Sequence, residues 1–555
     1  MNLPSPFERL LPDPRARQRA ALAAAGLALV GLLIWQRRHV GDWRVDDAYI
    51  SYSFAKNLAA GRGLVFSHGE RVEGYSNFLW VVLCSPAYLV GMGTKIYGFA
   101  RMLAWGFLGL LFASVDRIVR RRAGVVASFF ALALLAVTTD LVRAVLSGLE
   151  SVPYAALVAA GAAHYLTEDP ARRRHSIWWF IAAGLMRIDG FVPLAFVLGF
   201  ELVASIYERR FSVRALARWA GPGLLVYGLY FGARWAYYGL PLPTTYYAKN
   251  AVTTGDPYRG FKYLRDALTE WGAPVALAFG ALALRRPTRE SLYAAGFVVY
   301  YAAYVAATGG DWMPFNRFAL PLAPFLAALF VWGLAEARRY GAAAGPTAFR
   351  LAAGLGAAAY LFVAARVDGH VVDTKLEEGK QGMVRHVKLH TRENLLATLP
   401  WMRHVVRQPG DKLVTDYAGV FSVYTEASVI DMWGLCNAAI ALRGTTQGVA
   451  PVYGKTCLPC YREFEPDYFH VMVPLVRAEG DFTSQAQVIA QIFQGPALDR
   501  EIDLKGRYAT GRVRETATGR SLYFLERRRP DRPLVPRAPA PGVVVEYPFE
   551  PGGLG

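Results

Sequence analysis

The chain carries little charge for its length. Charged residues make up 19% of its 555 residues, whereas soluble proteins carry about 25%. Hydrophobic residues make up 54%, with a mean hydropathy of +0.23. This composition excludes an ordinary soluble domain and indicates a polytopic membrane protein. The first apolar run, 20–35, follows a basic segment and lacks a small-residue cleavage site, so we interpret it as a retained helix and not as a removed signal peptide.

Internal repeats are also missing. A membrane transporter would show repeats, with interrupted helices at corresponding positions and a binding site near the middle of the bilayer. The sequence shows no repeat, and its charged residues are predicted to gather at one face. A transporter is therefore disfavoured.

Cysteines are few, and three of the four lie in the polar C-terminal part, at Cys436, Cys457 and Cys460. The Cys457-Leu-Pro-Cys460 spacing is compatible with a redox pair or half of a zinc site, but no second Cys-x-x-Cys and no thioredoxin-like context accompany it. We favour a structural disulfide in an oxidising compartment, with its connectivity open. Cys84 lies in an apolar stretch and is predicted to be a packing residue.

Positive charge exceeds negative charge, with a formal net charge of +18. Lys and Arg occur in short clusters between apolar runs, which is typical of the cytoplasmic loops of membrane proteins. We therefore expect no nucleic-acid partner. The clusters expected in the cytoplasm are 15–19, 117–122, 172–174, 209–218, 285–289 and 338–350.

Apolar runs of roughly 17 to 25 residues can cross a bilayer as helices. The sequence predicts about eleven crossings of the plasma membrane, at 19–36, 98–117, 123–139, 150–167, 175–187, 190–207, 216–236, 271–286, 291–308, 317–337 and 348–366. The run 77–95 is expected to lie along the outer face, because a crossing there would place the cluster at 120–122 on the wrong side. The N-terminus is then cytoplasmic, and the loops 37–97, 140–149, 237–270 and 309–316 lie outside.

The composition divides the chain into three parts. Residues 1–366 form the predicted transmembrane domain, with 37–97 as its first extracytoplasmic loop. Residues 367–526 are polar, with strand-like runs at 412–415 and 427–430 and helical stretches near 390–407 and 484–494, and they predict a soluble extracytoplasmic α/β domain. Residues 527–555 are rich in Pro, Arg and Gly, and we expect them to be extended or disordered.

Two adjacent carboxylates, Asp46 and Asp47, stand where the first helix would leave the bilayer. Such a residue is a functional-site candidate, although it can also simply mark the helix exit. Arg317 has the alternative of pairing with Asp311, and Tyr246 and Tyr247 that of lying at the membrane interface. As a set, the polar and aromatic residues expected on this side favour a site there: Glu73, Tyr75, Glu150, Arg187, Asp189, Tyr246, Tyr247, Lys249, Asp311, Trp312 and Arg317.

The first loop carries a resemblance to a known family. It reads Asp46-Asp47-Ala48-Tyr49-Ile50 and then Gly69-Glu70-Arg71-Val72-Glu73-Gly74-Tyr75-Ser76-Asn77-Phe78-Leu79-Trp80. Supporting stretches are 147–150, 242–249, 309–314 with Arg317, 416–419 and 429–435. With these motifs the chain resembles the GT-C superfamily of polyprenyl-phosphate-dependent glycosyltransferases. Within it, the chain is similar to the branch of the mycobacterial terminal β-(1→2)-arabinofuranosyltransferase and flagellar-motor-control proteins.

The resemblance implies an inverting transfer of a sugar, with arabinofuranose expected, from a polyprenyl phosphate to a cell-envelope glycan acceptor outside the membrane. A carboxylate, Asp46 or Asp47 with a slight preference for Asp46, would take the proton of the acceptor hydroxyl. Arg187, Lys249 and Arg317 would bind the donor phosphate. The other residues of the set would contact substrate, with Trp312 and the tyrosines offering apolar faces to sugar or prenyl chain.

Some alternatives stay open. No cofactor is required by the resemblance, but some relatives use a divalent cation, for which Asp46, Asp47 and Glu150 would be oxygen ligands. Mannose or another sugar would need only a reshaped pocket. A non-enzymatic membrane scaffold or a carrier of lipid-linked sugar would not need the carboxylates and cations to converge.

Overall fold

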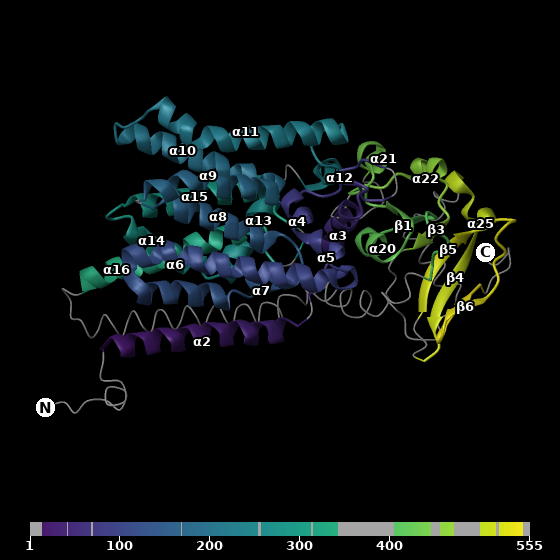
Figure 1. Cartoon of the computed structure of the whole chain (residues 1–555), viewed down its shortest axis with the longest axis horizontal. Coiled ribbons are helices and arrows are strands. Elements are labelled where there is room, and N and C mark those ends of the chain that lie inside the picture. The colour runs from purple at the N-terminus through teal and green to yellow at the C-terminus, as the bar shows by residue number, and fades with distance from the viewer. Residues whose placement is uncertain are drawn as a thin grey trace.

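The chain forms a helical bundle followed by a sheet domain, and Figure 1 shows the two end to end. In this computed structural model the described residues are 14–41, 43–67, 70–167, 169–253, 257–311, 313, 315–341, 404–445, 455–470, 500–517 and 521–547. The prediction of a helical membrane protein with a C-terminal α/β domain is confirmed at this level. The crossing 348–366, the helix 484–494 and residues 390–403 of the helix expected near 390–407 lie outside the described residues.

Helices occupy every predicted crossing from 19–36 to 317–337. The bundle contains α2 (Pro14–Val40), α6 (Ile96–Val137), α8 (Ser151–Tyr165), α9 (Pro170–Met186), α10 (Phe191–Tyr207), α11 (Val213–Tyr238), α14 (Ala273–Ala283), α15 (Arg289–Ala307) and α16 (Ala323–Gly341). Two predicted crossings, 98–117 and 123–139, fall within α6, which breaks at Gly124 in the left-handed region (φ +81°).

The number of about eleven crossings is not confirmed. Within the described residues, three helical segments are long and apolar enough to cross a membrane, namely Gly93–Val137, Ile188–Tyr207 and Leu320–Arg339. A bent pair, Thr139–Leu146 with Ser151–Tyr165, would make a fourth.

Several predicted loops contain helices. The loop 140–149 holds α7 (Thr139–Leu146), every residue of which is buried. Its Asp140 accepts hydrogen bonds from Trp271 Nε1 at 3.1 Å and Asn316 Nδ2 at 2.8 Å, which allows a polar helix to lie in the interior. The loop 237–270 holds α12 (Thr244–Thr253) and α13 (Pro257–Glu270). The run 77–95 forms α4 (Phe78–Cys84) and α5 (Pro86–Leu89), both too short to cross.

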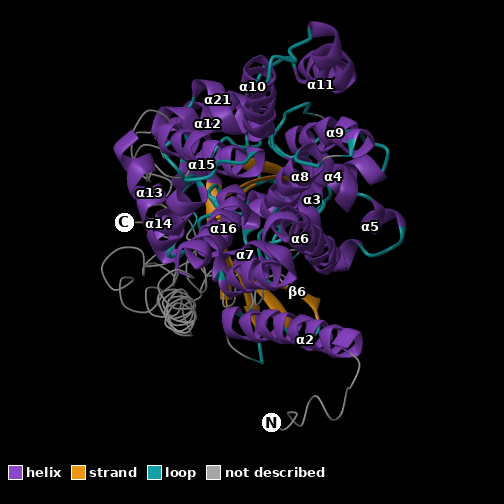
Figure 2. Ribbon diagram, turned by 90° about the vertical axis from the view of Figure 1, so that its left-hand side faces the viewer, coloured by secondary structure: helices purple, strands orange, loops and turns teal. Residues whose placement is uncertain are grey.

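The centre of the bundle is the apolar helix α8. Fourteen of its fifteen residues are buried, as expected for a helix that is apolar on all sides. Gly161 allows α9 to approach, because a Cβ there would lie 2.8 Å from the Phe180 ring. Figure 2 shows α8 with α6 and α16 at the centre, and α2, α11 and α13 at the periphery.

The sheet domain contains seven strands in the order β2-β1-β3-β5-β4-β7-β6. They are β1 (Lys412–Thr415), β2 (Ser428–Asp431), β3 (Tyr468–His470), β4 (Tyr508–Glu515), β5 (Ser521–Arg527), β6 (Arg537–Ala540) and β7 (Val543–Glu546). Strands β1, β2 and β3 are parallel and the other pairs are antiparallel. Helices α20 (Ala418–Tyr424), α21 (Ala438–Arg443), α22 (Leu458–Phe464) and α25 (Leu504–Arg507) complete the domain.

The sequence placed residues 527–555 outside this domain. That prediction is wrong for 537–546, which form two strands of the sheet. Strand β7 pairs with β4 from Val543 to Glu546, and β6 pairs with β7. The alternating apolar residues of β7 supply the reason, because Val543 and Val545 enter the core while Val544 faces partly outward. Composition alone concealed this short alternation among Pro and Arg residues.

Candidate functional site

The two carboxylates of the first loop lie in the first turn of α3 (Asp46–Ala59). Val45 precedes them in an extended conformation (φ −128°, ψ 142°), so the helix begins at the Asp pair. Negative charge in the first turn favours a helix N-terminus. Successive residues of a helix point about 100° apart, and the two carboxylates accordingly meet different parts of the molecule.

Asp46 binds the sheet domain. Its carboxylate oxygens accept the backbone N–H groups of Gly419 at 3.1 Å and Val420 at 2.8 Å, in the first turn of α20. Burial raises the pKa of Asp46 well above its usual range, although these two N–H groups oppose the rise. At the other end of α3, Lys56 Nζ donates to the Val423 carbonyl at 3.1 Å. Helix α3 thus holds both ends of α20.

Gly419 makes this contact close. A Cβ at this position would collide with the backbone oxygen of Asp46 and would lie 2.8 Å from the backbone nitrogen of Ile50. Only glycine lets the two helices approach to this distance. Residues 416–419, one of the stretches that supported the family resemblance, therefore help to dock the sheet domain on α3. This role could not be predicted from their residue types.

Asp47 faces the charged part of the site. In the described part of the chain its carboxylate accepts no side-chain hydrogen bond, and it interacts electrostatically with Arg317 and with Asp431. Its side chain is half-buried. Asp47 therefore keeps its lone pairs for another partner, whereas those of Asp46 already accept N–H groups.

Arg187 is held at the point where α9 stops. It leaves the helix in an extended conformation (φ −148°, ψ 143°), and the short 3-10 helix Ile188–Gly190 follows. Its guanidinium donates to Glu150 Oε1 at 3.0 Å and to Asp189 Oδ1 and Oδ2 at 2.8 and 3.1 Å. Three residues that were expected on one side of the membrane, Glu150, Arg187 and Asp189, are thus in direct contact.

A hydrogen-bonded chain links this arginine to α3. Asn77 Nδ2 donates to Glu150 Oε2 at 2.7 Å, and Asn77 also exchanges hydrogen bonds with Ser51 Oγ. Asn77 was in the family motif, but neither Asn77 nor Ser51 was predicted as a site residue. On the other side, Tyr304 Oη donates to Asp189 Oδ2 at 3.3 Å. Every polar group of this buried cluster thus has a partner, which fixes the position of Arg187.

Arg317 is the second cation of the site. It forms an ion pair with Asp311, the alternative that the sequence left open. Its guanidinium carbon lies 5.4 Å from the centroid of the Phe318 ring, and that of Arg187 lies 4.7 Å from the same centroid. The two guanidinium groups therefore contact one aromatic ring, and each has its own carboxylate.

The predicted residues Glu73 and Tyr75 contact α11. Arg234 Nε donates to both carboxylate oxygens of Glu73 at 2.8 Å, and burial raises the pKa of Glu73 to about 7 although Arg234 opposes the rise. Tyr238 Oη donates to Tyr75 Oη at 3.1 Å. These contacts fasten the first loop to the bundle, so a substrate contact for Glu73 and Tyr75 has no support in this geometry.

The first loop also touches the sheet domain. Thr244 Oγ1 donates to the carbonyl of Glu73 at 2.8 Å and to that of Leu435 at 2.6 Å. A Cβ on Gly74 would collide with Cys436 Sγ. Loop, bundle and sheet domain therefore meet at Thr244, the first residue of α12.

Helix α12 carries three further predicted residues. Tyr246 is exposed and Tyr247 half-buried, and their rings meet edge to face at 5.6 Å. Burial raises the pKa of the Cys436 thiol, and the positive charge of Lys249 opposes this rise. Asp47 acts on the same thiol, so Lys249 lies in the neighbourhood of Asp47. Trp312 lies outside the described residues.

Asp431 is a residue that the sequence analysis missed. It ends β2 and accepts the backbone N–H groups of Trp433 at 3.0 Å and Cys436 at 2.8 Å. Burial raises the pKa of Asp431 to about 6, and the charge of Asp47 adds to the rise. Its position at the end of a strand, before a Gly-containing turn, was the signal that could have found it.

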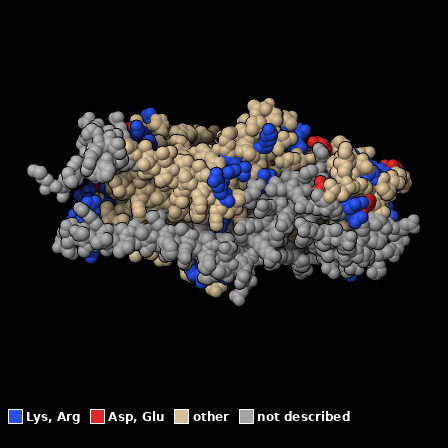
Figure 3. Space-filling view, turned by 90° about the horizontal axis from the view of Figure 1, so that it is seen from below, with Lys and Arg blue, Asp and Glu red and all other residues tan. Residues whose placement is uncertain are grey.

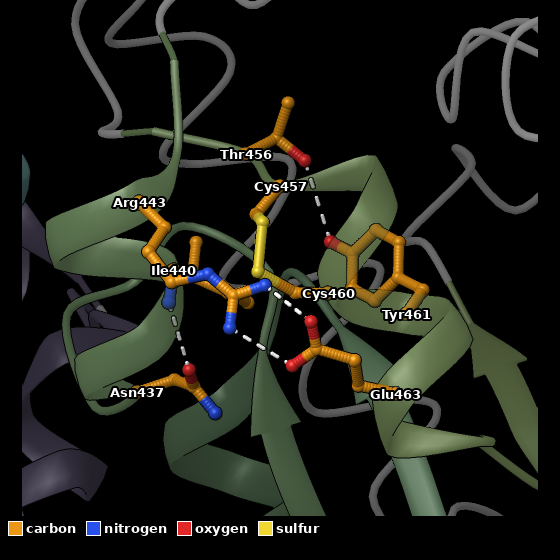
Figure 4. Close-up of a disulfide and its surroundings, with 8 residues drawn as sticks. All are labelled: Asn437, Ile440, Arg443, Thr456, Cys457, Cys460, Tyr461 and Glu463. Carbon is orange, nitrogen blue, oxygen red and sulfur yellow. Dashed lines mark hydrogen bonds and ion pairs between the residues drawn. A yellow bond between two sulfur atoms is a disulfide. The ribbon is translucent and has the colours of Figure 1, made fainter. Parts of the chain in front are cut away.

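The cysteines pair locally. Cys457 and Cys460 form a disulfide at the start of α22, and Cys84 and Cys436 are free and buried. Figure 4 shows the disulfide beside the Arg443–Glu463 ion pair and the Tyr461–Thr456 contact. The structure thus selects one pairing among the three candidates and excludes Cys436 from it.

The residues suggested for a metal do not fit a cation site. Both oxygens of Asp46 accept N–H groups, and both oxygens of Glu150 accept hydrogen bonds from Arg187 and Asn77. Among the described residues no group of three or more His, Cys, Asp or Glu could hold an ion. A cation would need these carboxylates to leave their present partners.

A cavity of about 350 Å³ lies between the first loop and the sheet domain. It is lined by the cations Lys56, Arg62 and Arg71, by Glu426 and by the ring of Tyr237. Arg71 lies 4.8 Å from the centroid of this ring. The cavity combines an aromatic face with charged groups, which is a surface that polar organic molecules can bind.

No family model matches the chain. It is 32% identical to a terminal β-(1→2)-arabinofuranosyltransferase of Mycobacterium tuberculosis over 258 residues, 43% of this chain and 39% of the relative. It is 26% identical to the enzyme of the same name from Corynebacterium glutamicum over 357 residues, 52% of this chain and 47% of the relative. The chain thus spans less than half the length of these curated relatives.

The fold has a solved counterpart. ArnT from Cupriavidus metallidurans, in a crystal structure bound to undecaprenyl phosphate, superposes with a TM-score of 0.54 at 11% identity, over 81% of this chain and 93% of that one. At this identity the likeness shows the fold alone. The chain therefore has the fold of a GT-C glycosyltransferase and is similar in sequence to GT-C arabinofuranosyltransferases, which confirms the resemblance that its first-loop motif indicated.

Proposed function

We propose that the chain is a membrane-bound inverting glycosyltransferase that takes a sugar from a polyprenyl phosphate and passes it to a glycan acceptor at the extracytoplasmic face. One observation carries the proposal. Two buried guanidinium groups, Arg187 and Arg317, flank one aromatic ring, and Arg317 interacts with a carboxylate, Asp47, that accepts no hydrogen bond among the described residues.

Asp47 is the base of the proposed reaction. Its carboxylate takes the proton of the acceptor hydroxyl while that oxygen bonds to the anomeric carbon. The bond from this carbon to the phosphate oxygen breaks, and the phosphate leaves with the electron pair. The motif slightly favoured Asp46 as the base. The hydrogen bonds that its carboxylate accepts from backbone N–H groups of α20 argue against that role. Asp46 instead orients α3, and with it Asp47.

Arg187 and Arg317 bind the leaving phosphate. Guanidinium groups bind phosphate oxygens in pairs, and they stabilise growing negative charge best in a site that water hardly enters. Without donor, Asp189 and Asp311 occupy them. The donor phosphate competes with these carboxylates, and Lys249 on α12 adds a third positive charge. No metal ion enters the proposed reaction.

The sugar is proposed to be arabinofuranose, because the curated relatives are named for transferring it. The lipid carrier is proposed to be a polyprenyl phosphate, because ArnT binds undecaprenyl phosphate in the same fold. We assign a distant part of the acceptor glycan to the cavity beside Tyr237, because an aromatic face next to charged groups suits a sugar chain.

The test measures transfer of labelled sugar from synthetic polyprenyl-phosphate arabinofuranose and polyprenyl-phosphate mannose by the purified chain, with and without EDTA. Transfer of arabinofuranose that EDTA does not change supports the proposal. Transfer of mannose alone would replace the sugar and keep the chemistry. Binding of polyprenyl phosphate with no transfer from either donor would favour a scaffold or a lipid carrier.

A further inference from the structure

A second arginine-rich site lies at the end of the bundle that is far from the sheet domain. A cavity of about 410 Å³ opens there between the N-terminal ends of α9 and α11 and the C-terminal end of α10. In Figure 1 the connection from α10 to α11 lies at the left end of the bundle, and the sheet domain lies at the right. The cavity therefore lies at the opposite end of the bundle from Asp47.

The lining of this cavity is strongly cationic. Four arginines, Arg173, Arg174, Arg210 and Arg218, line it against one carboxylate, Glu201. Glu201 binds Arg173 at 2.7 Å and Arg210 at 2.8 Å, and it also binds Arg289 at 2.6 Å.

Two of the four arginines have no counter-charge. Among the described residues, Arg174 and Arg218 form no ion pair, and both side chains are exposed. The single glutamate that lines the cavity, Glu201, already forms ion pairs with three other arginines. Positive charge is therefore left over in the cavity for an anionic ligand.

The cavity also offers neutral hydrogen-bonding groups and a ring. Ser212 lines it with a hydroxyl oxygen that accepts the Ala215 N–H at 3.3 Å and an O–H that can still donate, whereas the Ser205 hydroxyl already donates to the Leu202 carbonyl at 2.9 Å. Trp219 lies at the wall of the cavity with its indole N–H donating to Ser176 Oγ at 3.1 Å. Hydroxyl groups beside guanidinium groups suit a phosphate, whose oxygens accept several hydrogen bonds. An indole at the boundary of a membrane suits the region of lipid headgroups and glycerol.

Apolar helix surface continues from the cavity. On α11, Leu225 is 63% exposed and Leu229 is 65% exposed. A ligand of the cavity can thus extend along α11. Figure 3 views the molecule from the side away from α11, and there too the described helical part shows a broad surface without charge, with Lys and Arg in separate groups.

We propose that this cavity binds the phosphate group of an anionic glycerophospholipid. Arg174 and Arg218 bind the phosphate, Arg173 and Arg210 remain fixed by Glu201 beside it, and the acyl chains lie along the exposed face of α11 that carries Leu225 and Leu229. A free phosphate would use the same arginines but would gain nothing from the apolar faces. The proposal is independent of the sugar and of the catalytic residues.

The experiment measures lipid binding by the full chain in detergent, by native mass spectrometry, with phosphatidylglycerol and phosphatidylcholine as probes. Phosphatidylglycerol is expected to bind more tightly. Arg174→Gln and Arg218→Gln should each weaken its binding about fivefold, as one cation at a membrane surface contributes about that factor. The matched control is Arg214→Gln, an exposed arginine one turn before Arg218 and outside the cavity lining, which should change binding less than twofold.

Three outcomes would overturn the proposal. One is equal binding of the two lipids. Another is an equal loss in Arg214→Gln and Arg218→Gln, which would show a diffuse charge effect. The third is displacement of phosphatidylglycerol by millimolar inorganic phosphate, which would show a site for free phosphate. Because neither Arg174 nor Arg218 has a partner among the described residues, equal melting temperatures in phosphatidylcholine are expected for all variants and check that they fold.

Discussion

Arginines gather at both ends of the bundle, but in different surroundings. Near the sheet domain, Arg187, Arg234 and Arg317 are buried. Arg187 pairs with Glu150 and Asp189, and Arg234 and Arg317 pair with one carboxylate each. At the opposite end, Glu201 alone binds three arginines, and others have no partner among the described residues. Buried ion pairs are costly unless geometry holds them, whereas exposed cations cost little. The buried pairs of Arg187 and Arg317 suit exchange with a substrate, and the exposed arginines suit adhesion to anionic lipid.

The neighbours Asp46 and Asp47 also differ in their surroundings, and we expect them to differ in their roles. Asp47→Asn should lower sugar transfer by about 10²- to 10⁴-fold, because a positioned base contributes that factor. Asp46→Asn serves as the control, since the amide keeps one acceptor oxygen for α20. It should reduce transfer far less and should lower the melting temperature instead. Equal losses of transfer with unchanged stability would contradict this division of roles.

The link from α3 to Arg187 should matter more for turnover than for folding. Asn77→Ala removes the donor to Glu150 and should lower kcat/KM on the order of tenfold to a hundredfold, because a small displacement of a binding group costs that much. Asn57→Ala is the matched control, since Asn57 is also buried in this loop region and bonds the carbonyls of Val65 and Phe66. If both variants lose only stability, Asn77 has no positioning role.

Contact between the bundle and the sheet domain depends on Gly419. Gly419→Ala should destabilise the docked state by about 1 to 3 kcal/mol, because the new methyl group meets the backbone of α3. Limited proteolysis of the junction and thermal unfolding measure the effect. Gly228→Ala in α11, where a Cβ meets nothing within 4 Å, should be neutral or slightly stabilising. A neutral Gly419→Ala would show that the helices do not need this close approach.

Asp431 should make stability depend on pH. Its pKa is about 6 in the folded state against 3.8 for an ordinary aspartate. Between these values Asp431 keeps its proton in the folded chain and releases it in the unfolded chain. Its contribution to the free energy of unfolding is therefore fully present below about pH 4 and is lost as pH rises to about 6. The loss amounts to at most about 3 kcal/mol. Asp431→Asn should flatten this part of the curve in thermal unfolding, and an unchanged slope would refute the assignment.

Much of the bundle could be predicted from the sequence, because crossing helices are set by local apolar runs. The location of Arg187, Glu150 and Asp189 on one side of the membrane could also be predicted, from the order of the apolar runs. The role of Asp46 could not, because its partners lie 373 and 374 residues away along the chain. The buried helix α7 was missed for the same reason, since Asp140 pairs with its neighbour Arg143 but also accepts hydrogen bonds from the distant residues Trp271 and Asn316.

The sheet shows the limit of composition as evidence. Strands β1 and β2 were predicted from short apolar runs, whereas β6 and β7 lie in a stretch dominated by Pro and Arg. Strand β7 pairs with β4, and β6 pairs with β7, and composition does not reveal these pairings. The disulfide shows the same limit, because three cysteines allowed several pairings and only the fold brings Cys457 and Cys460 together while it leaves Cys436 against Gly74.

The most direct test of the donor site is the binding of a polyprenyl phosphate without sugar to wild type, Arg317→Gln, Arg187→Gln, Asp47→Asn and the exposed control Arg338→Gln. The account predicts that Arg317→Gln and Arg187→Gln each weaken binding at least tenfold, because each loses a charge-assisted phosphate contact, while Asp47→Asn and Arg338→Gln still bind. Equal affinity in wild type and both site arginine variants would contradict the assignment of these two guanidinium groups to the donor phosphate.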